Sequence, residues 1–469
     1  MSDASPAADG DAPGDAGAGA GDSDGKGFTP WDQDAVKLTM LVIGLFGLYL
    51  LGGYLLGYGM RQQLASIGQL SVLIGVFAML ALALNLHWGY TGLFNIGIIG
   101  FMAIGIYATA VLSKGAATAE PAAGSTGGFG LPLWMGIIGG VIAAAIFGGL
   151  VALPALRLRA DYFAIVTVGI SEIVRFTLLE TSFQKVQIAG YWTGLGGGSG
   201  LILDFDPTDR FLETFGLMDA YVGFSDTLGE QLGVGSNPKP IFDPLLYGLI
   251  LFVFLIGFYM LLQRTGNSPY GRVLKAIRED EEATKSLGKD TNRFKIKGFM
   301  LGCALMGLAG ILFYAEQGAI TPDAFRPRLT FYVWIALIIG GAGSNTGSVA
   351  GGAVFAAFLF RGPIFFKNIV QDTFDSLDAP GTFGQAVSPI TGADPIPLVA
   401  YTIDNMGQLQ LVLMGIVLIY LMHNRPEGMF GHRKEPASPI RLQDRTQSKP
   451  AASAAATDGG RDQGGTDDE

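Results

Sequence analysis

Residues 268–299 read SPYGRVLKAIREDEEATKSLGKDTNRFKIKGF, the one long charged segment that interrupts a series of apolar runs. Nine Lys or Arg and five Asp or Glu lie between residues 264 and 297. Apolar runs flank this segment at 244–263 and 298–320. Because basic loops between membrane spans lie on the cytoplasmic side, we predict that residues 264–297 form a cytoplasmic loop.

The same loop carries a helical pattern. Val273, Ile277, Ala283 and Leu287 recur at roughly helical spacing, charges fill the other faces, and Gly288 lies where a helix would end. One interpretation is an amphipathic helix that docks another protein at the membrane's inner face. The other is a solvated charged loop that only fixes orientation. The pattern alone favours neither.

The composition predicts an all-α polytopic membrane protein. Of the 469 residues, 49% are hydrophobic and 15% are charged, whereas soluble domains have about 25% charged residues. Several apolar runs are close to the 20 residues that cross a bilayer. Many of the 70 glycines lie inside these runs, which is typical of closely packed membrane helices. The single cysteine, Cys303, excludes a disulfide within one chain.

Ten apolar runs are predicted to span the membrane: 36–60, 67–86, 92–112, 132–156, 162–179, 244–263, 298–320, 331–339, 349–366 and 409–422. Counting outward from the basic loop, both termini are cytoplasmic, and the acidic inserts at 180–243 and 367–408 are external. The fifth, eighth and tenth runs are short or interrupted, which predicts that some helices are discontinuous. Two halves of five spans each would have opposite orientations, so any internal duplication is inverted.

The chain divides into a transmembrane domain at 35–431 and two tails. Residues 1–34 and 432–469 are rich in Ala, Gly, Asp and Ser and are predicted to be disordered. A basic region followed by an apolar one does not begin the chain, so we predict no cleaved signal peptide. The net charge of −10 lies mostly outside the spans, and we interpret it as an adaptation to high salt. The expected location is the plasma membrane.

Glu282-Ala283-Thr284, with Gly288 six positions after the glutamate, resembles the EAA loop of ABC importer permeases. In that family the loop forms a helix that sits in a cleft of the ATPase subunit. The surrounding GR-x-L-x-AIRE-D-E-x-A-x-x-x-G string is similar to branched-chain amino acid permeases of the LivM type. The resemblance implies that Arg278, Glu282, Ala283 and Gly288 couple the chain to an ATPase. Thr284 departs from the usual third residue of the triad.

A second block, Gly89-Tyr90-Thr91-Gly92 with Asn95, Gly97, Gly105 and Tyr107, resembles another string of the family. Asn95 stands where the family usually has Ser, and Ile98 where it usually has His, so selectivity differs if that His contacts substrate. We take five residues of this region as candidate pathway or structural residues: Asn85, Gly89, Gly92, Asn95 and Gly97. Glycines at this spacing permit close helix crossing, and packing is the favoured interpretation.

A third block runs from Leu156 through Tyr162 to Glu172-Ile173-Val174-Arg175 and gives the most specific match to the family. Glu172 and Arg175 lie three residues apart on a predicted helix and can pair. Charges within spans usually face protein or water. We favour a buried or interfacial ion pair that locks two helices over a gating or substrate role.

Two glycine-rich strings, at 193–201 and 340–351, and the closing Arg425-Pro426-Glu427-Gly428 also resemble the family. Gly341, Gly343 and Ser344 are candidate pathway or structural residues. A phosphate-binding loop would end in GKS or GKT, and the sequence contains neither. The histidines His87, His423 and His432 show no metal-ligand spacing and are predicted to be interfacial or solvated. We predict no metal site, no nucleophile constellation and no nucleic-acid surface.

The resemblance covers about residues 67–431. The resemblance implies a permease subunit of an ATP-driven importer for leucine, isoleucine and valine. It implies as partners two ATPase subunits that hydrolyse ATP with Mg, a homologous permease, an external binding protein and membrane lipid. The chain itself is then not an enzyme and carries no cofactor. The alternatives are a permease for urea or short amides, and a stand-alone secondary transporter in which Glu172 is the obvious ion-coupling candidate.

Overall fold

The computed structural model describes residues 30–429 except 56, 122–125, 157, 159, 204, 236, 374–378, 393 and 426. Most of the two predicted tails and His432 lie outside the described residues, as do Arg157 and Arg159 of the third block. Residues 30–34 of the predicted N-terminal tail belong to the first helix.

Within the described residues, eight helical segments are long and apolar enough to cross a membrane. They are α1 (Pro30–Leu55), α2 (Met60–Asn85) with its π-helical extension η1 (Leu86–Tyr90), α4 (Leu133–Ala155), α5 (Ala160–Leu179), α8 (Lys239–Asn267), α11 (Thr291–Ala315), the continuous α13 (Asn345–Val354), η5 (Phe355–Arg361) and α14 (Gly362–Thr373), and α17 (Met406–Asn424). Two shorter apolar helices are α3 (Ile98–Ser113) and α12 (Arg328–Gly340). At 1.5 Å per residue these two are roughly 24 and 20 Å long, less than the ~30 Å hydrocarbon core.

These segments correspond one to one with the ten predicted runs, and the chain is a polytopic helical membrane protein. Some predicted boundaries were wrong. The third helix begins at Ile98, because residues 91–97 form an irregular break. The basic loop is shorter than predicted, since α8 continues to Asn267 and α11 already begins at Thr291.

The remaining elements lie between the spans. They are η2 (Thr181–Phe183), η3 (Gly197–Ser199), η4 (Pro322–Phe325), η6 (Ser388–Gly392), α6 (Pro207–Thr214), α7 (Met218–Gln231), α9 (Pro269–Glu279), α10 (Glu281–Ser286), α15 (Phe383–Val387) and α16 (Ile396–Asp404). Antiparallel pairs join β1 (Val186–Ile188) to β2 (Tyr191–Thr193), and β3 (Leu201–Ile202) to β4 (Ala319–Ile320). The two predicted inserts are therefore folded.

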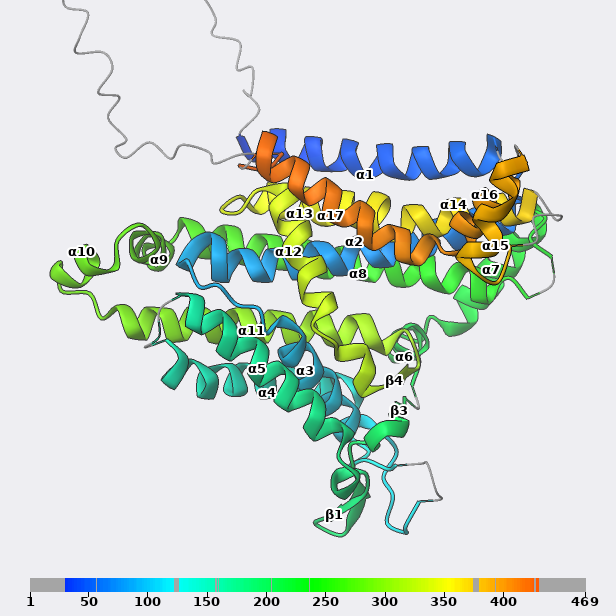
Figure 1. Cartoon of the computed structure of the whole chain (residues 1–469). Helices are drawn as coiled ribbons and strands as arrows, with labels where there is room; N and C mark the ends of the chain where they lie inside the picture. The colour runs from blue at the N-terminus through cyan, green and yellow to red at the C-terminus, as the bar shows by residue number, and fades with distance from the viewer. Residues whose placement is uncertain are drawn as a thin grey trace, which may run out of the picture.

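The bundle has two distinct ends (Figure 1). The basic end carries α9 and α10, and the first residues of α1 and the last residues of α17 also lie there. The insert end carries α6, α7, α15 and α16. This arrangement places both described chain ends on the same side as the basic loop and both inserts on the other, as predicted. Which end faces the cytoplasm stays a prediction.

Helix α2 lies at the centre of the bundle. It packs along α8 and α13 and also contacts α11 and α12. Small residues permit these close approaches. A Cβ on Gly75 would lie 2.9 Å from Leu251, and one on Gly352 would lie 2.6 Å from the backbone of Ala78. The glycines inside the apolar runs therefore set the helix spacing at this centre.

The packing shows an internal correspondence between the two halves. Helix α3 packs on α4 and α11, and α12 packs in the same way on α13 and α2. Helix α5 contacts α3 and α4, while α17 contacts α12 and the η5–α14 continuation of α13. Helix α2 runs toward the basic end and α11 runs away from it (Figure 1). Four helices of each half therefore support the predicted inverted relation, whereas α8, which lies along α2, and α1 do not follow it.

Candidate functional site

The basic loop folds as two short helices, α9 and α10. The Ser268 hydroxyl caps α9 by accepting a hydrogen bond from the Gly271 amide (3.2 Å), and Pro269 fits the first helical position. Asp280 then has an extended backbone (φ −155°), and its carboxylate caps α10 by accepting from the Ala283 amide (2.9 Å). The segment is therefore helical, as its pattern indicated, but it forms two helices, because Asp280 ends the first helix and starts the second.

The predicted apolar face of this loop was also partly wrong. Leu274 and Ile277 of α9 are buried against the bundle, whereas Ala283 is exposed and Leu287 is 80% exposed. Gly288 has φ +77° and follows α10 directly, so the predicted helix end is confirmed. Helix α10 therefore presents an apolar side chain outward from the basic end.

A partly buried ionic contact fixes α10 to the start of α11. The Glu281 carboxylate accepts hydrogen bonds from Lys295 and from the Thr291 hydroxyl (3.0 Å), and Lys285 lies 3.0 Å from it. Partial burial raises the pKa of Glu281, but the two lysines outweigh this and hold the pKa below its ordinary value. Glu281 is therefore a carboxylate at neutral pH and holds α10 in place.

Helix α9 contacts η1, the turn at the end of α2, and Gly92 in the irregular break that follows η1. The Arg278 guanidinium donates to the Gly89 carbonyl, and the Lys275 ammonium lies 5.4 Å from the centroid of the Tyr90 ring. Gly92, with φ +73°, lies against Arg278, and a Cβ there would be 3.2 Å from the arginine side chain. The loop that the sequence singled out thus touches the second predicted block directly.

Two glycine-rich breaks meet at this point, one after α2 and the other between α12 and α13. The Asn85 side-chain oxygen accepts from the Gly343 amide (2.7 Å). A Cβ on Gly89 would lie 2.5 Å from the Gly343 nitrogen, so only glycine fits there. Gly341 has φ +101°, and the Ser344 hydroxyl caps α13 by accepting from the Gly347 amide (3.0 Å). The structure therefore brings these predicted residues together.

Asn345, which the sequence reasoning missed, holds the two breaks to each other. Its side-chain oxygen accepts from the Asn85 amide (3.1 Å) and from the Tyr90 hydroxyl (2.9 Å). Its own amide donates to the Gln263 side chain of α8 (3.2 Å). Asn85, Gln263 and Asn345 each lie at the basic end of a different apolar run, a signal that could have flagged them.

His87 is buried, so the prediction of an interfacial or solvated side chain was wrong for it, whereas His423 is exposed. The His87 Nε2 donates to the Phe299 carbonyl (3.0 Å), and its Nδ1 accepts from the Asn95 amide (3.1 Å). Asn95 in turn accepts from the Gly97 amide (2.8 Å). The π-helical turn η1 directs His87 into the bundle, and the chain of bonds stiffens the break.

Aromatic side chains line the other side of this break. Trp88, Phe94 and Trp334 form a cluster with ring centroids 4.6–5.5 Å apart. The Trp334 indole donates to the Asn95 carbonyl (3.1 Å), and Trp88 keeps 36% of its surface exposed. This aromatic cluster beside the break was not identified from the sequence.

The remaining candidate residues lie elsewhere or serve packing. Glu172 and Arg175 pair at 2.7 Å, as predicted, and Arg175 also reaches Asp323 of η4 (3.4 Å). The Glu172–Arg175 pair lies within α5, so it is the Arg175–Asp323 contact that ties α5 to η4, the turn that precedes α12, away from the two breaks. Gly97 has no space for a side chain, since a Cβ would lie 2.4 Å from the Thr167 carbonyl. For Gly97 the packing interpretation is therefore supported.

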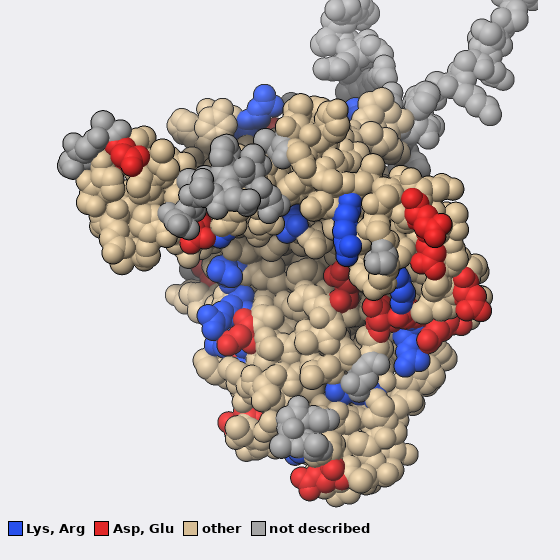
Figure 2. Space-filling model, turned by 90° about the vertical axis from the view of Figure 1, so that its right-hand side faces the viewer, with Lys and Arg blue, Asp and Glu red and all other residues tan. Residues whose placement is uncertain are grey.

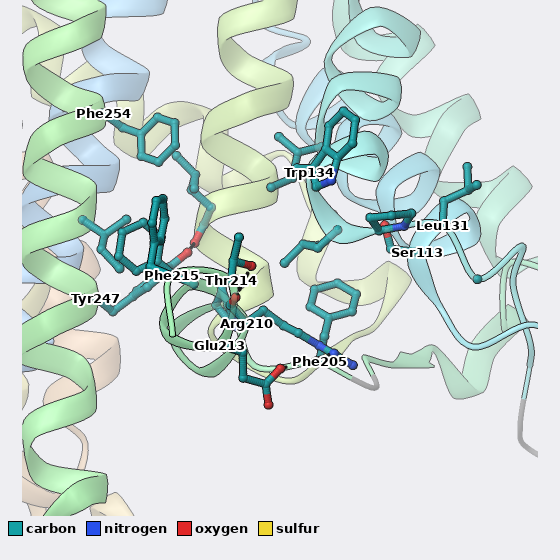
Figure 3. A pocket seen from close by; sticks show the side chains of 18 of the residues that line it. Ser113, Leu131, Trp134, Phe205, Arg210, Glu213, Thr214, Phe215, Tyr247 and Phe254 are labelled. Carbon is teal, nitrogen blue, oxygen red and sulfur yellow. Dashed lines mark hydrogen bonds and ion pairs between the residues drawn. The ribbon is translucent and has the colours of Figure 1, made fainter. Parts of the chain in front are cut away.

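The described residues form a large cavity of about 880 Å³ at the insert end (Figure 3). Its walls are mostly apolar and come from α4, α6 and α8, with Trp134, Phe215 and Phe254 around it. None of the candidate residues lines it. A smaller cavity of about 200 Å³ at the basic end is lined by Gly92, Arg278 and Lys295 among others. Within the described ranges, acidic, histidine and cysteine side chains form no group that could hold a metal ion.

Residues 66–377 match the family described as branched-chain amino acid transport system / permease component. The chain is 32% identical over 320 residues to the high-affinity branched-chain amino acid transport system permease protein LivM of Escherichia coli (strain K12), covering 67% of this chain and 66% of that protein. Identity to LivM of Salmonella typhimurium is 34%, over 58% of this chain and 57% of the relative. The probable branched-chain amino acid transport permease protein LivM of Methanocaldococcus jannaschii is 27% identical, over 61% of this chain and 78% of that protein. The chain thus spans about two thirds or less of the first two relatives, and no solved structure matches it.

Proposed function

Because this chain belongs to the family of permease components of branched-chain amino acid transport systems, we propose that it is a permease subunit of an ATP-driven importer for leucine, isoleucine and valine. The relatives carry that substrate class in their names. The observation that carries the proposal is the contact between α9 and the break after α2, made by Arg278 and the Gly89 carbonyl. It joins an exposed helical element to the interior of the bundle.

In this proposal α9 and α10 form the surface gripped by an ATPase subunit. Glu282, Ala283 and Leu287 are exposed on α10 and available to a partner, while Leu274 and Ile277 anchor α9 to the bundle. The Glu281–Lys295 contact would make α10 and the start of α11 move as one body. The partner subunits hydrolyse ATP with Mg, and this chain converts their motion into a change of pathway access. The basic end is then the cytoplasmic end.

The insert end would receive the external binding protein. Figure 2 looks onto this end and shows acidic side chains gathered along one side of it. Glu213 of α6 and Asp219, Asp226 and Glu230 of α7 are exposed. Such a surface fits a binding protein whose docking face carries lysine or arginine. Opposite charges of this kind would raise the association rate of the two proteins at low salt. A homologous permease completes the pathway.

The test is uptake by reconstituted complexes. The chain is co-purified with its ATPase subunits and partner permease, placed in vesicles with ATP inside, and offered labelled leucine or labelled urea with the cognate binding protein. We expect ATP-dependent uptake of leucine. Uptake of urea alone would instead indicate a permease for short amides. Uptake by vesicles lacking the ATPase subunits would indicate a secondary transporter.

Orientation and ATPase contact are tested with the same complex. A Leu287→Cys variant places a thiol on the most exposed apolar position of α10. We expect this thiol to cross-link to the ATPase subunit. We also expect it not to react with membrane-impermeant thiol reagents added outside intact cells. Labelling from outside would place the basic end on the wrong side for the proposal. The native Cys303 is buried and does not compete.

A further inference from the structure

Asn345 of α13 joins two helical segments that are far apart in the sequence, α2 with its extension η1 and α8. Its side chain is 5% exposed and bonds with Asn85 at the end of α2, with Tyr90 at the end of η1 and with Gln263 in α8. A buried amide of α13 that meets partners on two other segments fixes the relative positions of all three, since losing any partner leaves a buried polar group unpaired. Asn345 is also the first residue of α13, so it fixes the start of that helix as well.

Helix α9 holds the other side of the same turn. The Arg278–Gly89 hydrogen bond and the Lys275–Tyr90 contact both attach α9 to η1 (Leu86–Tyr90). Tyr90 therefore has its ring against α9 and its hydroxyl on Asn345, 2.9 Å away. Tyr90 is therefore one side chain that contacts both the basic loop and the start of α13.

The packing around these contacts leaves little freedom for small adjustments. A Cβ on Gly266 would lie 2.7 Å from the Tyr90 hydroxyl, and a Cβ on Gly89 would lie 2.5 Å from the Gly343 nitrogen. Backbones this close do not slide gradually past one another. A displacement of α9 must therefore either carry η1 and residues 341–345 with it or separate the Tyr90–Asn345 bond.

We propose that Tyr90 and Asn345 form a clamp that passes the motion of α9 to the break at residues 341–345. In the state described here the clamp is closed and joins α2, η1, α8 and α13. When the partner ATPase displaces α9, the clamp transmits that displacement and then opens, so that α12 and α13 are released from α2. The inference rests on the proposed function and adds the positioning residues through which coupling runs.

The clamp differs from a purely structural network in what it controls. A structural network would affect stability and leave the stoichiometry of transport unchanged. A clamp sets how much solute moves for each ATP hydrolysed. That ratio is measured in vesicles from simultaneous uptake and phosphate release, and it does not depend on how much complex survives purification.

The test compares two tyrosine-to-phenylalanine variants in the reconstituted complex. Tyr90→Phe removes the hydroxyl from Asn345, which keeps its bonds to Asn85 and Gln263. Tyr247→Phe removes a hydroxyl of the same kind at the opposite end of the bundle, where it donates to the Leu312 carbonyl (2.5 Å). We expect Tyr90→Phe to lower the ratio of solute to ATP roughly fivefold, the effect of one buried hydrogen bond, and Tyr247→Phe to leave it unchanged.

An unchanged ratio in Tyr90→Phe, or an equal fall in Tyr247→Phe, would overturn the clamp while wild-type uptake still supports the proposed function. Absence of ATP-dependent uptake by the wild-type complex, for both leucine and urea, would overturn the proposed function and the clamp together. If the complex transports urea instead, the same ratio is measured with urea and decides the clamp.

Discussion

The two ends of the bundle use polar side chains in different ways. At the basic end the polar groups are buried and bond between segments far apart in the sequence, as Asn85 does with Asn345. At the insert end they are more exposed and often local, as in the Arg210–Glu213 pair, three residues apart on α6. Buried polar groups depend on their partners, whereas exposed pairs add little stability. Changes at the basic end should therefore disturb transport, and comparable changes at the insert end should not.

The largest effect is expected from Gly89→Ala. The added methyl would lie 2.0 Å from the Asn85 side chain and 2.5 Å from the Gly343 backbone nitrogen, so the two breaks would be forced apart. We expect a loss of about 1–3 kcal/mol in stability, with uptake abolished. The loss of stability is measured by thermal unfolding in detergent, and the loss of uptake is measured in vesicles. Gly257→Ala is the control. Gly257 lies on an exposed part of α8, and nothing lies within 4 Å of its added methyl. A tolerated Gly89→Ala would end the idea of a tight junction.

A smaller and more selective effect is expected from Gly288→Val. Gly288 follows α10 with φ +77°, and a β-branched residue there is strained by about 1–2 kcal/mol. We expect membrane insertion to persist while uptake and stimulated ATP hydrolysis fall. Gly216→Val is a matched control, because Gly216 follows α6 with φ +65° and likewise has no neighbour within 4 Å. If both variants lose uptake equally, the strain acts on stability alone and α10 has no special role.

The smallest effect is expected from Glu172→Gln. This change removes one charge of an ion pair within α5 and leaves the contact of Arg175 with Asp323 of η4 in place. Partly exposed ion pairs contribute about 0–1 kcal/mol, so stability and uptake should stay close to wild type. Uptake at several external pH values measures this. A strong loss, or a new pH dependence of uptake, would assign Glu172 a role in ion coupling and favour the secondary transporter.

The packing correspondence between the halves does not extend to their polar contacts. The short helices α3 and α12 occupy corresponding places in the packing. The segments that precede these two helices, however, contact different parts of the chain. The break after α2 contacts α9 and residues 341–345, whereas the turn before α12 contacts α5 through Arg175 and Asp323. The same packing plan therefore carries a buried polar junction at one end and an exposed ion pair at the other.

Local features of the chain could be predicted from the sequence. The Glu172–Arg175 pair needed only helical spacing, and the end of α10 at Gly288 needed only the preference of glycine for positive φ. The division of α9 from α10 at Asp280 was missed, although a capping aspartate is also a local signal. The burial of His87 could not be predicted, because a polar residue at the end of an apolar run is equally compatible with the interface.

The sequence by itself determined the ten apolar segments, the charge difference between the loops and the glycines that let helices approach, since hydropathy and backbone conformation depend on near neighbours. Only the tertiary structure decided that Asn85 and Asn345, 260 positions apart, share a hydrogen bond, and that α9 rests on the break beside them. Hydropathy describes each span separately. A polar side chain can face the protein interior only where it finds a hydrogen-bond partner. The packing of the helices determines where such a partner lies.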